Sequence, residues 1–334
     1  MAEGGVSLVV TGGSGLADVV ASARLAEAAG FASVWATEFY DRSATVSLAA
    51  MAQATTRIGL GTAIAYAFGR TPVVLAAEAR DLDELAGGRF ILGLGAGTRR
   101  MQTDWHGLDG EHPASRMEEL VPLLRALWRL HEGPVDHDGR FYRLHVRPTA
   151  AVAPPLRPDV PVYLAGVNPR MIEAAGRVGD GLVGHPLFTP EYVREVARPA
   201  LAHGAERAGR DTAVPIAGYL TCSVDADRGA ARQAAAAVVA FNSTVKTYRV
   251  VHRLHGFEEH AERIREAWRG GDFARAVSLV PDEMLDTIAL AGTPDEVRAR
   301  FAERWAGVYE HTLLWPPAFR GMDGVRAVVE AFAG

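Results

Sequence analysis

The stretch that most constrains the fold of this chain runs from residue 58 to residue 97. Two short apolar runs bounded by glycines predict strands at residues 58–62 and 90–95. Residues 72–85 between them are predicted to form a helix, because Thr71-Pro72 suits a helix start and a glycine pair follows its end. Two consecutive strands joined by one helix predict a parallel βαβ unit. The glycines after the second strand are expected to let the backbone approach a large flat or anionic group.

The same alternation of strand and helix continues along the chain. Further strands are predicted at residues 6–11, 32–37, 160–165, 181–184, 214–224 and 311–315, and helices at 16–29, 45–54, 169–178 and 190–208. Eight strands in this rhythm within 334 residues predict an α/β fold, a (β/α)8 TIM barrel formed as one domain by residues 1–334. An open doubly wound sheet is the alternative, and the regular alternation up to the eighth strand disfavours it.

Two insertions interrupt this rhythm. The first follows the fourth strand, with a polar loop at 98–115, an amphipathic helix at 116–130 and a hairpin at 133–144 whose turn is Asp138-Gly139. The second follows the seventh strand, where residues 241–286 contain helices near 258–269 and 272–280. A capping box formed by Thr293 and Glu296 then predicts the start of a helix before the last strand.

Composition and motifs exclude several classes of function. The net charge of −5 and the scattered basic residues give no footprint for nucleic acid. The single cysteine, Cys222, excludes an intrachain disulfide, and the histidines lack the paired spacing of a metal site. No apolar run reaches about 18 residues, and the N-terminus has no signal-peptide pattern, so a cytoplasmic protein without a membrane partner is expected. The glycines at 93, 95 and 97 do not have dinucleotide-fingerprint spacing, which disfavours a nicotinamide-binding domain.

In a barrel of this kind the active site lies at the carboxyl ends of the strands. These positions include Glu38, Tyr40, Tyr66 and Gly97. Taken together, they offer few acids or bases and many glycines and apolar residues. Such a composition is typical of a site in which an organic cofactor carries the reaction and the protein orients it. Glu38 and Tyr40 each also have an alternative role: Glu38 as a helix cap or an ion-pair partner of Arg42, and Tyr40 as a residue that only packs at the top of the barrel.

Six segments together resemble the bacterial luciferase-like family. The longest of them, residues 82–97, reads Leu-Asp-Glu-Leu-Ala-Gly-Gly-Arg-Phe-Ile-Leu-Gly-Leu-Gly-Ala-Gly, and the others are residues 30–35, 56–62, 161–169, 175–181 and 291–297. The resemblance covers most of the chain and implies the barrel fold.

The family divides by cofactor. Some members are monooxygenases that use reduced FMN and oxygen, whereas others move a hydride with the deazaflavin coenzyme F420. This chain resembles the F420 branch, which includes methylenetetrahydromethanopterin reductase and glucose-6-phosphate dehydrogenase. The resemblance implies an F420-dependent oxidoreductase that transfers a hydride between the deazaflavin C5 and a small organic substrate, by reduction of an activated C=C or C=N bond. The alternatives are an FMN-dependent luciferase-like monooxygenase and a flavin-binding barrel without catalysis.

The resemblance also implies site residues. Family members have a non-proline cis peptide after the third strand, behind the cofactor ring, and the matching bond is Ala63–Ile64. The residues expected to bind the cofactor are Glu38, Ala63, Ile64, Ala65, Gly95, Gly97, Thr98, Met101, Gly166, Val167 and Asn168. Phe39 stands where the family has histidine, and Thr98 stands where the sugar-phosphate enzyme has glutamate. Both departures argue against a glucose-6-phosphate dehydrogenase.

Because the histidine and the glutamate are absent, any proton that the reaction needs is expected to come from Glu38, Tyr40, Tyr66 or water, with Glu38 preferred. The loop at 98–115 and the insertion at 241–286 are expected to line the substrate pocket, with Trp105, His106, Phe241, Asn242 and Lys246 as candidates. The resemblance further implies a homodimer through helices beside the second and third strands, such as 45–54.

Overall fold

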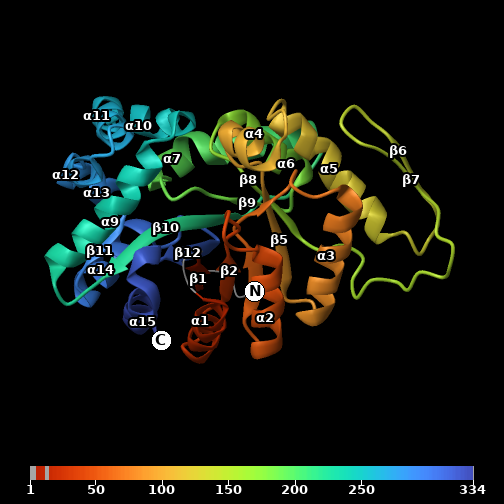
Figure 1. The fold of residues 1–334 in the computed structure, drawn as a ribbon, viewed down its shortest axis with the longest axis horizontal. Coiled ribbons are helices and arrows are strands. Elements are labelled where there is room, and N and C mark those ends of the chain that lie inside the picture. The colour runs from red at the N-terminus through yellow and green to blue at the C-terminus, as the bar shows by residue number, and fades with distance from the viewer. Residues whose placement is uncertain (1–4, 12–14, 334) are drawn as a thin grey trace.

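Eight parallel strands close into a barrel in this computed structural model, which describes residues 5–11 and 15–333 (Figure 1). In their order around the barrel, the strands are β1 (Val6–Val10), β2 (Ser33–Ala36), β3 (Gly59–Thr62), β5 (Phe90–Gly95), β8 (Val162–Ala165), β9 (Gly181–Val183), β10 (Ile216–Val224) and β12 (His311–Trp315). Closure comes from β12, which pairs with β1 and places Thr312 opposite Val6. The predicted (β/α)8 barrel is therefore confirmed, and the open sheet is excluded.

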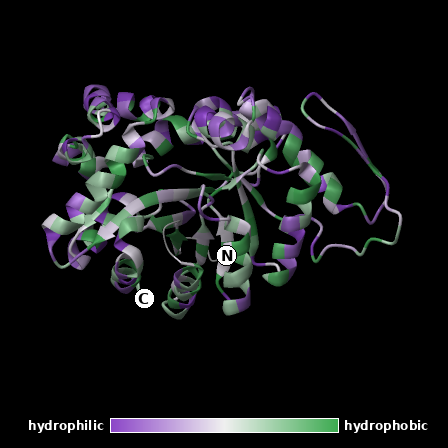
Figure 2. Ribbon diagram, viewed as in Figure 1, coloured by the Kyte–Doolittle hydropathy of each residue, from purple (hydrophilic) through white to green (hydrophobic). Residues whose placement is uncertain are grey.

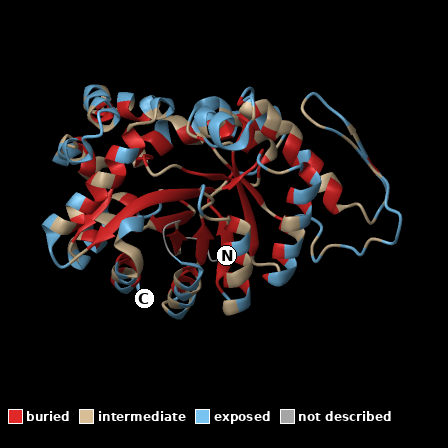
Figure 3. Ribbon diagram, viewed as in Figure 1, coloured by how far each residue is buried: buried red, intermediate tan, exposed pale blue. Residues whose placement is uncertain are grey.

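Helices surround the barrel between successive strands. They are α1 (Leu16–Ala28), α2 (Ala44–Ala54), α3 (Pro72–Leu85), α5 (Pro113–Trp128), α6 (Pro169–Val178), α7 (Pro190–Tyr192), α8 (Arg198–Arg207), α14 (Pro294–Arg300) and α15 (Gly321–Phe332). The barrel strands are buried along their length, and the helices turn exposed faces outward (Figure 3). Local signals set the bounds of α3 as predicted: the Thr71 hydroxyl accepts a hydrogen bond from the Val74 amide, and Pro72 occupies the first turn.

The first insertion differs from its prediction in two ways. Residues 99–106 form the helix α4 (Arg99–His106) and not a loop, because Thr98 caps its first turn and Gly107, in the left-handed conformation, ends it. The hairpin pairs β6 (Val135–Asp138) with β7 (Arg143–Val146), so its loop is residues 139–142 and not the predicted two-residue turn. The reason is Glu119 of α5, whose carboxylate accepts hydrogen bonds from three successive loop amides and draws the loop onto the helix.

The second insertion is more helical than expected. Its elements are α9 (Arg228–Ser243), a 3-10 turn (Lys246–Tyr248), α10 (Arg249–Leu254), α11 (Glu258–Arg269), α12 (Phe273–Ser278), α13 (Asp282–Ile288) and β11 (Leu290–Gly292). The strand β11 lies outside the barrel, where it pairs with the last residues of β10. Both α4 and α11 are strongly hydrophilic, whereas the barrel strands are hydrophobic (Figure 2). None of the helices in the described part of the chain combines the length and hydrophobicity needed to cross a membrane.

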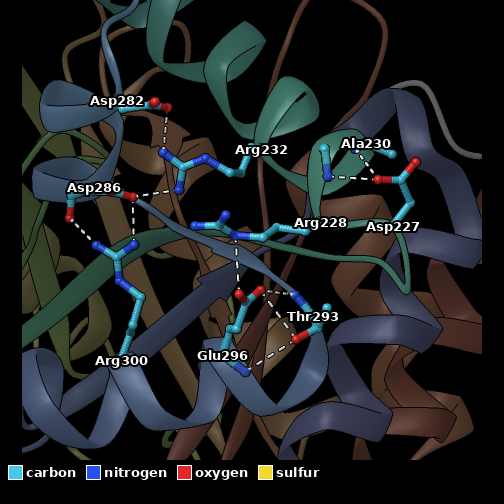
Figure 4. Close-up of polar contacts among 10 residues, drawn as sticks. Asp227, Arg228, Ala230, Arg232, Asp282, Asp286, Thr293, Glu296 and Arg300 are labelled. Carbon is cyan, nitrogen blue, oxygen red and sulfur yellow. Dashed lines mark hydrogen bonds and ion pairs between the residues drawn. The ribbon is translucent and has the colours of Figure 1, made fainter.

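Ion pairs join the second insertion to α14, the helix that precedes the last barrel strand (Figure 4). Arg232 of α9 donates hydrogen bonds of 2.7 Å to Asp282 and to Asp286, both on α13. Arg300 of α14 donates to the same Asp286 carboxylate at 2.5 Å and to its backbone carbonyl at 2.9 Å. Because α9 and α13 flank the segment 244–281, both ends of that segment are anchored to the barrel wall.

The barrel interior is filled by side chains from the strands and from Ala63, directly after β3. This interior cluster consists of Val9, Trp35, Ala63, Ile91, Tyr163, Val183, Ala217, Tyr219 and Leu313. The Tyr219 hydroxyl crosses the barrel from β10 and donates a 2.7 Å hydrogen bond to the carbonyl of Ala63, directly after β3. The cluster therefore forms a floor, and a ligand must bind above it at the carboxyl ends of the strands, a region called the barrel mouth below.

Candidate active site at the barrel mouth

The peptide bond between Ala63 and Ile64 is cis, which confirms the expectation for this position. The backbone carbonyls of both residues accept hydrogen bonds: that of Ala63 from the Tyr219 hydroxyl, and that of Ile64 from the amide of Glu38 at 3.1 Å. The Ile64 side chain lies over Gly95, where a Cβ atom would come within 2.7 Å of the Ile64 Cδ1 atom. The absence of a side chain at Gly95 therefore leaves room for the Ile64 side chain.

Glu38 is held by three hydrogen-bond donors. Its carboxylate accepts from the Tyr66 amide at 2.8 Å and from both terminal nitrogens of Arg70, at 2.8 and 2.5 Å. The Glu38 and Arg70 side chains are only 9% and 16% exposed, and the hydrogen bonds to Glu38 raise the pKa of Arg70. This pairing makes Glu38 an acceptor that fixes the segment after the cis peptide. Sequence reasoning missed Arg70, because the pairing joins residues 32 positions apart.

An aromatic group covers one side of the mouth. Trp105 of α4 makes edge-to-face contacts with Phe39 and Tyr40, at centroid distances of 5.1 and 5.6 Å. Tyr66, in the short strand β4 (Ala65–Tyr66), contacts the neighbouring His106 at 4.9 Å. Tyr40 is exposed, whereas Tyr66 is buried, and burial together with the charge of Glu38 raises the pKa of Tyr66. The Tyr66 phenol thus keeps its proton across the physiological pH range.

The remaining predicted cofactor residues lie along β5 and its neighbour β8. Gly97 is in the left-handed conformation with φ of 70°, and a Cβ there would come within 3.1 Å of the Tyr66 ring. Thr98 and Met101 contact each other at the start of α4, where the Thr98 hydroxyl accepts from the Met101 amide at 3.2 Å. On β8 the turn of Gly166, Val167 and Asn168 leads into α6, and Tyr192 donates a 2.6 Å hydrogen bond to the Val167 carbonyl. Ala65 pairs with Leu94 of β5.

The second insertion contributes a histidine and tyrosine cluster on the opposite side. The ring of His185, directly after β9, lies 3.9 Å from the ring of Tyr248. The Leu187 amide donates to His185 Nδ1 at 3.2 Å, which places the proton of the neutral ring on Nε2. Burial lowers the pKa of His185 to about 3 and that of His252 to about 4. Sequence reasoning did not find Tyr248 and His252, because they lie in an insertion without a strand pattern.

These buried histidines predict acid sensitivity. His252 is 1% exposed, and its pKa of about 4 lies below the ordinary value of about 6.5. Between these values the unfolded chain binds a proton that the folded chain does not, so stability present above pH 6.5 is lost as pH falls toward 4. The expected loss from this one residue between pH 7 and pH 5 is about 2 kcal/mol in the free energy of unfolding.

Urea unfolding at the two pH values measures this loss. The variant His252→Leu should show a smaller decrease between pH 7 and pH 5 than the parent chain. Equal decreases in the two proteins would show that His252 stays exposed to protonation in the folded state.

Two neighbouring polar atoms on β10 and β12 have no hydrogen-bond partner among residues 5–11 and 15–333. They are Thr221 Oγ1 on β10 and Trp315 Nε1 at the end of β12, and both atoms are buried. The two residues are paired in register on neighbouring strands. The sequence analysis did not select Thr221; the available signal was a polar residue two positions after the inward-facing Tyr219. Among the described residues, no group of three potential metal ligands occurs at the mouth or elsewhere.

Comparison with known proteins gives consistent results. The family model described as luciferase-like monooxygenase matches residues 3–311. The 5,10-methylenetetrahydromethanopterin reductase of Methanolobus tindarius is 35% identical over 285 residues, which cover 84% of each chain.

Solved structures agree in fold. The coenzyme F420 dependent tetrahydromethanopterin reductase from Methanopyrus kandleri superposes with a TM-score of 0.81 at 27% identity and covers 99% of this chain and 100% of that chain. The oxygenating constituent of 3,6-diketocamphane monooxygenase from Pseudomonas putida, in complex with FMN, superposes with a TM-score of 0.69 at 18% identity and covers 99% and 98% of the two chains. At that identity the second likeness extends to the fold alone.

Proposed function

The chain belongs to the luciferase-like monooxygenase family, and from this premise we propose that it is a coenzyme F420-dependent oxidoreductase that reduces an activated C=C or C=N bond of a small organic substrate. The observation that carries the proposal is an apolar mouth above a floor closed by side chains, in a chain 35% identical to a 5,10-methylenetetrahydromethanopterin reductase. The reductases from Methanolobus tindarius and Methanopyrus kandleri support F420 over FMN, since both are more similar in sequence to this chain than the FMN-containing monooxygenase.

The mouth has the surfaces that a planar heterocycle requires. Ile64, Ala165 and Trp315 are partly exposed hydrophobic residues that pack on the interior cluster, and they offer an apolar platform to a ring. The unpaired Thr221 and Trp315 polar atoms match the carbonyl groups that a deazaflavin or a flavin carries. When bound in reduced form, F420 supplies a hydride from C5 of its ring.

The chain's own residues then have distinct roles in the proposal. Glu38, through Arg70 and the Tyr66 amide, holds the segment 63–66 on which the ring would rest. The turn at Gly166, Val167 and Asn168 and the segment from Gly95 through Thr98 to Met101 would hold the remainder of the cofactor. The aromatic group around Trp105 excludes water from this side of the ring.

Proton transfer is assigned to Tyr66 in preference to Glu38, which the sequence analysis placed first. Both oxygens of Glu38 already accept hydrogen bonds from Arg70, so in the proposal this carboxylate positions the segment and does not transfer the proton. Tyr66 keeps its phenol proton, and Tyr40, being exposed, is the second candidate. The substitution of the family histidine by Phe39 and of glutamate by Thr98 leaves no stronger acid at those two positions.

Anaerobic titration tests the proposal. Oxidised F420 is expected to bind with a change in its fluorescence, and reduced F420 bound to the chain should be oxidised by a panel of cyclic enones and imines without oxygen. Tight binding of FMN with consumption of oxygen, and no binding of F420, would instead establish the FMN-dependent monooxygenase. Binding of either cofactor with no turnover on any compound of the panel would favour the non-catalytic flavin-binding barrel.

A homodimer, the single domain over residues 1–334 and the cytoplasmic location remain predictions. In favour of an interface beside the second and third strands, Val46 of α2 and Val73 and Val74 of α3 are exposed hydrophobic residues. Light scattering of the purified chain measures the oligomeric state directly.

A further inference from the structure

Two neighbouring side chains on β10 and β12 carry buried polar atoms that have no hydrogen-bond partner among the described residues. The indole nitrogens of Trp35 and Trp128 donate to Ser33 Oγ and to the Ala76 carbonyl, at 2.7 and 3.0 Å. Among the residues that the structure describes, Trp315 Nε1 has no such acceptor, and Thr221 Oγ1 has neither a donor nor an acceptor. Thr221 is 1% exposed, so the hydroxyl is shielded from bulk solvent in addition to being unpaired.

The two groups share one face and one level of the barrel. Along β10 the side chains of Ala217 and Tyr219 belong to the interior cluster, whereas Leu220 and Cys222 pack outward; strand alternation therefore directs Thr221 inward. On β12 the same alternation directs Trp315 inward after Leu313, and the Trp315 ring meets that of Tyr219 edge to face at 5.6 Å. Register pairs Thr221 with Trp315, so the two polar groups are neighbours across adjacent strands.

This pair lies across the mouth from the cis peptide. Three strands lie between β10 and β3 in either direction around the eight-stranded barrel, so the two strands face each other, and the Tyr219–Ala63 hydrogen bond spans that distance one layer below. A ligand that rests on Ile64 thus presents its opposite side or edge to Thr221 and Trp315.

We propose that Thr221 and Trp315 form a two-point subsite that binds a carbonyl-type acceptor of the ligand in the barrel mouth. An indole N–H only donates, and a threonine hydroxyl both donates and accepts. The pair therefore suits a carbonyl oxygen, alone or with an adjacent N–H group. Its existence does not depend on the proposed function, which supplies only the candidate ring.

Two ligands bring this chemistry to the mouth. One is the cofactor ring itself, whose pyrimidine part carries carbonyl and N–H groups, and the other is a substrate with a carbonyl conjugated to the reducible bond. Thr221 and Trp315 would hold the carbonyl of such a substrate, and the reducible bond next to that carbonyl would face the cofactor ring.

The test uses Thr221→Val, which keeps the side-chain shape and removes the hydroxyl, and Trp315→Phe, which removes the N–H group. Thr221→Ser keeps the hydroxyl and serves as the matched control. Each full-length protein is titrated with oxidised F420 by fluorescence, and with cyclohex-2-en-1-one by ligand-observed NMR; cyclohexene is the matched probe that lacks the acceptor. Thermal unfolding without any ligand provides a readout that is independent of binding and activity.

The expected results have opposite signs for binding and stability. Thr221→Val and Trp315→Phe should each weaken one carbonyl-bearing probe about tenfold, while Thr221→Ser retains most of the affinity and cyclohexene shows no difference. Without ligand, Thr221→Val should raise Tm by about 2 °C or more, because a buried unpaired hydroxyl is removed. Loss of F420 binding in the variants assigns the acceptor to the ring, and loss confined to cyclohex-2-en-1-one assigns it to the substrate.

The proposal is overturned if both probes bind to both variants as they do to the parent chain, which would mean that the pair holds ordered water only. It is also overturned if the parent chain binds neither probe in a carbonyl-dependent manner. Failure of F420 to bind the parent chain would refute the proposed function alone, since the cyclohexenone titration and the Tm comparison still decide the subsite.

Discussion

Gly93→Ala is expected to destabilise the barrel by more than about 4 kcal/mol, or to prevent folding altogether. A Cβ atom at Gly93 would lie 1.8 Å from the carbonyl oxygen of Thr62, which is backbone of the neighbouring strand β3. The strands cannot separate to relieve this clash without loss of two hydrogen bonds: the Thr62 hydroxyl donates to the Gly93 carbonyl at 2.7 Å and accepts from the Gly93 amide at 2.8 Å. Urea unfolding followed by circular dichroism measures the effect.

The matched control is Gly270→Ala at the end of α11. Gly270 has an ordinary helical φ of −74°, and the nearest neighbour of an added Cβ would be the Ala267 carbonyl oxygen at 3.4 Å. Its free energy of unfolding should change by less than about 0.5 kcal/mol. If Gly93→Ala unfolds at the same urea concentration as this control, the close approach of β3 and β5 is not as described.

Glu38→Gln is the second substitution with a large expected effect. It removes the charge that pairs with Arg70 while the side chain keeps its size, and breaking a buried pair by removal of one partner costs about 3 kcal/mol. Because Glu38 also accepts the Tyr66 amide, the segment after the cis peptide loses its anchor, and affinity for the cofactor should fall about tenfold or more. Unfolding in urea and F420 titration measure the two effects separately.

Glu78→Gln is the control for this prediction. Glu78 Oε2 forms an ion pair with the Arg70 Nε atom at 2.8 Å, but its side chain is 32% exposed. The expected loss of stability is about 1 kcal/mol or less, with cofactor affinity unchanged. Equal losses from the two variants would show that the Glu38 pair does not position the mouth.

Sequence patterns predicted the fold where the deciding signals are local. The bounds of α3, α6 and β12 agree with the prediction, because caps, prolines and apolar runs mark their ends within a few residues. The helix α4 was missed because Gln102 is its only buried residue, so it has no apolar stripe to detect. The hairpin register was wrong because Glu119, which lies on another element, decides it.

The site was predicted less completely, for a related reason. The cis bond at Ala63–Ile64 is confirmed, since the residues around it carry the family resemblance. The role of Glu38 depends on Arg70, whose approach is set by the chain's path between β4 and α3 and leaves no local pattern. Thr221 becomes conspicuous only when the hydrogen bonds of its surroundings are known.

The Tyr219 hydroxyl, which ends on the Ala63 carbonyl, has a consequence for protein engineering. Chimeras that exchange the β3 turn with that of a relative would leave a buried phenol facing a foreign backbone, unless the matching stretch of β10 is moved with it. The turn after β3 and the matching stretch of β10, more than 150 positions apart in the chain, should therefore be exchanged together as one module. Libraries that aim to change what this enzyme accepts should vary its rim and leave that module intact.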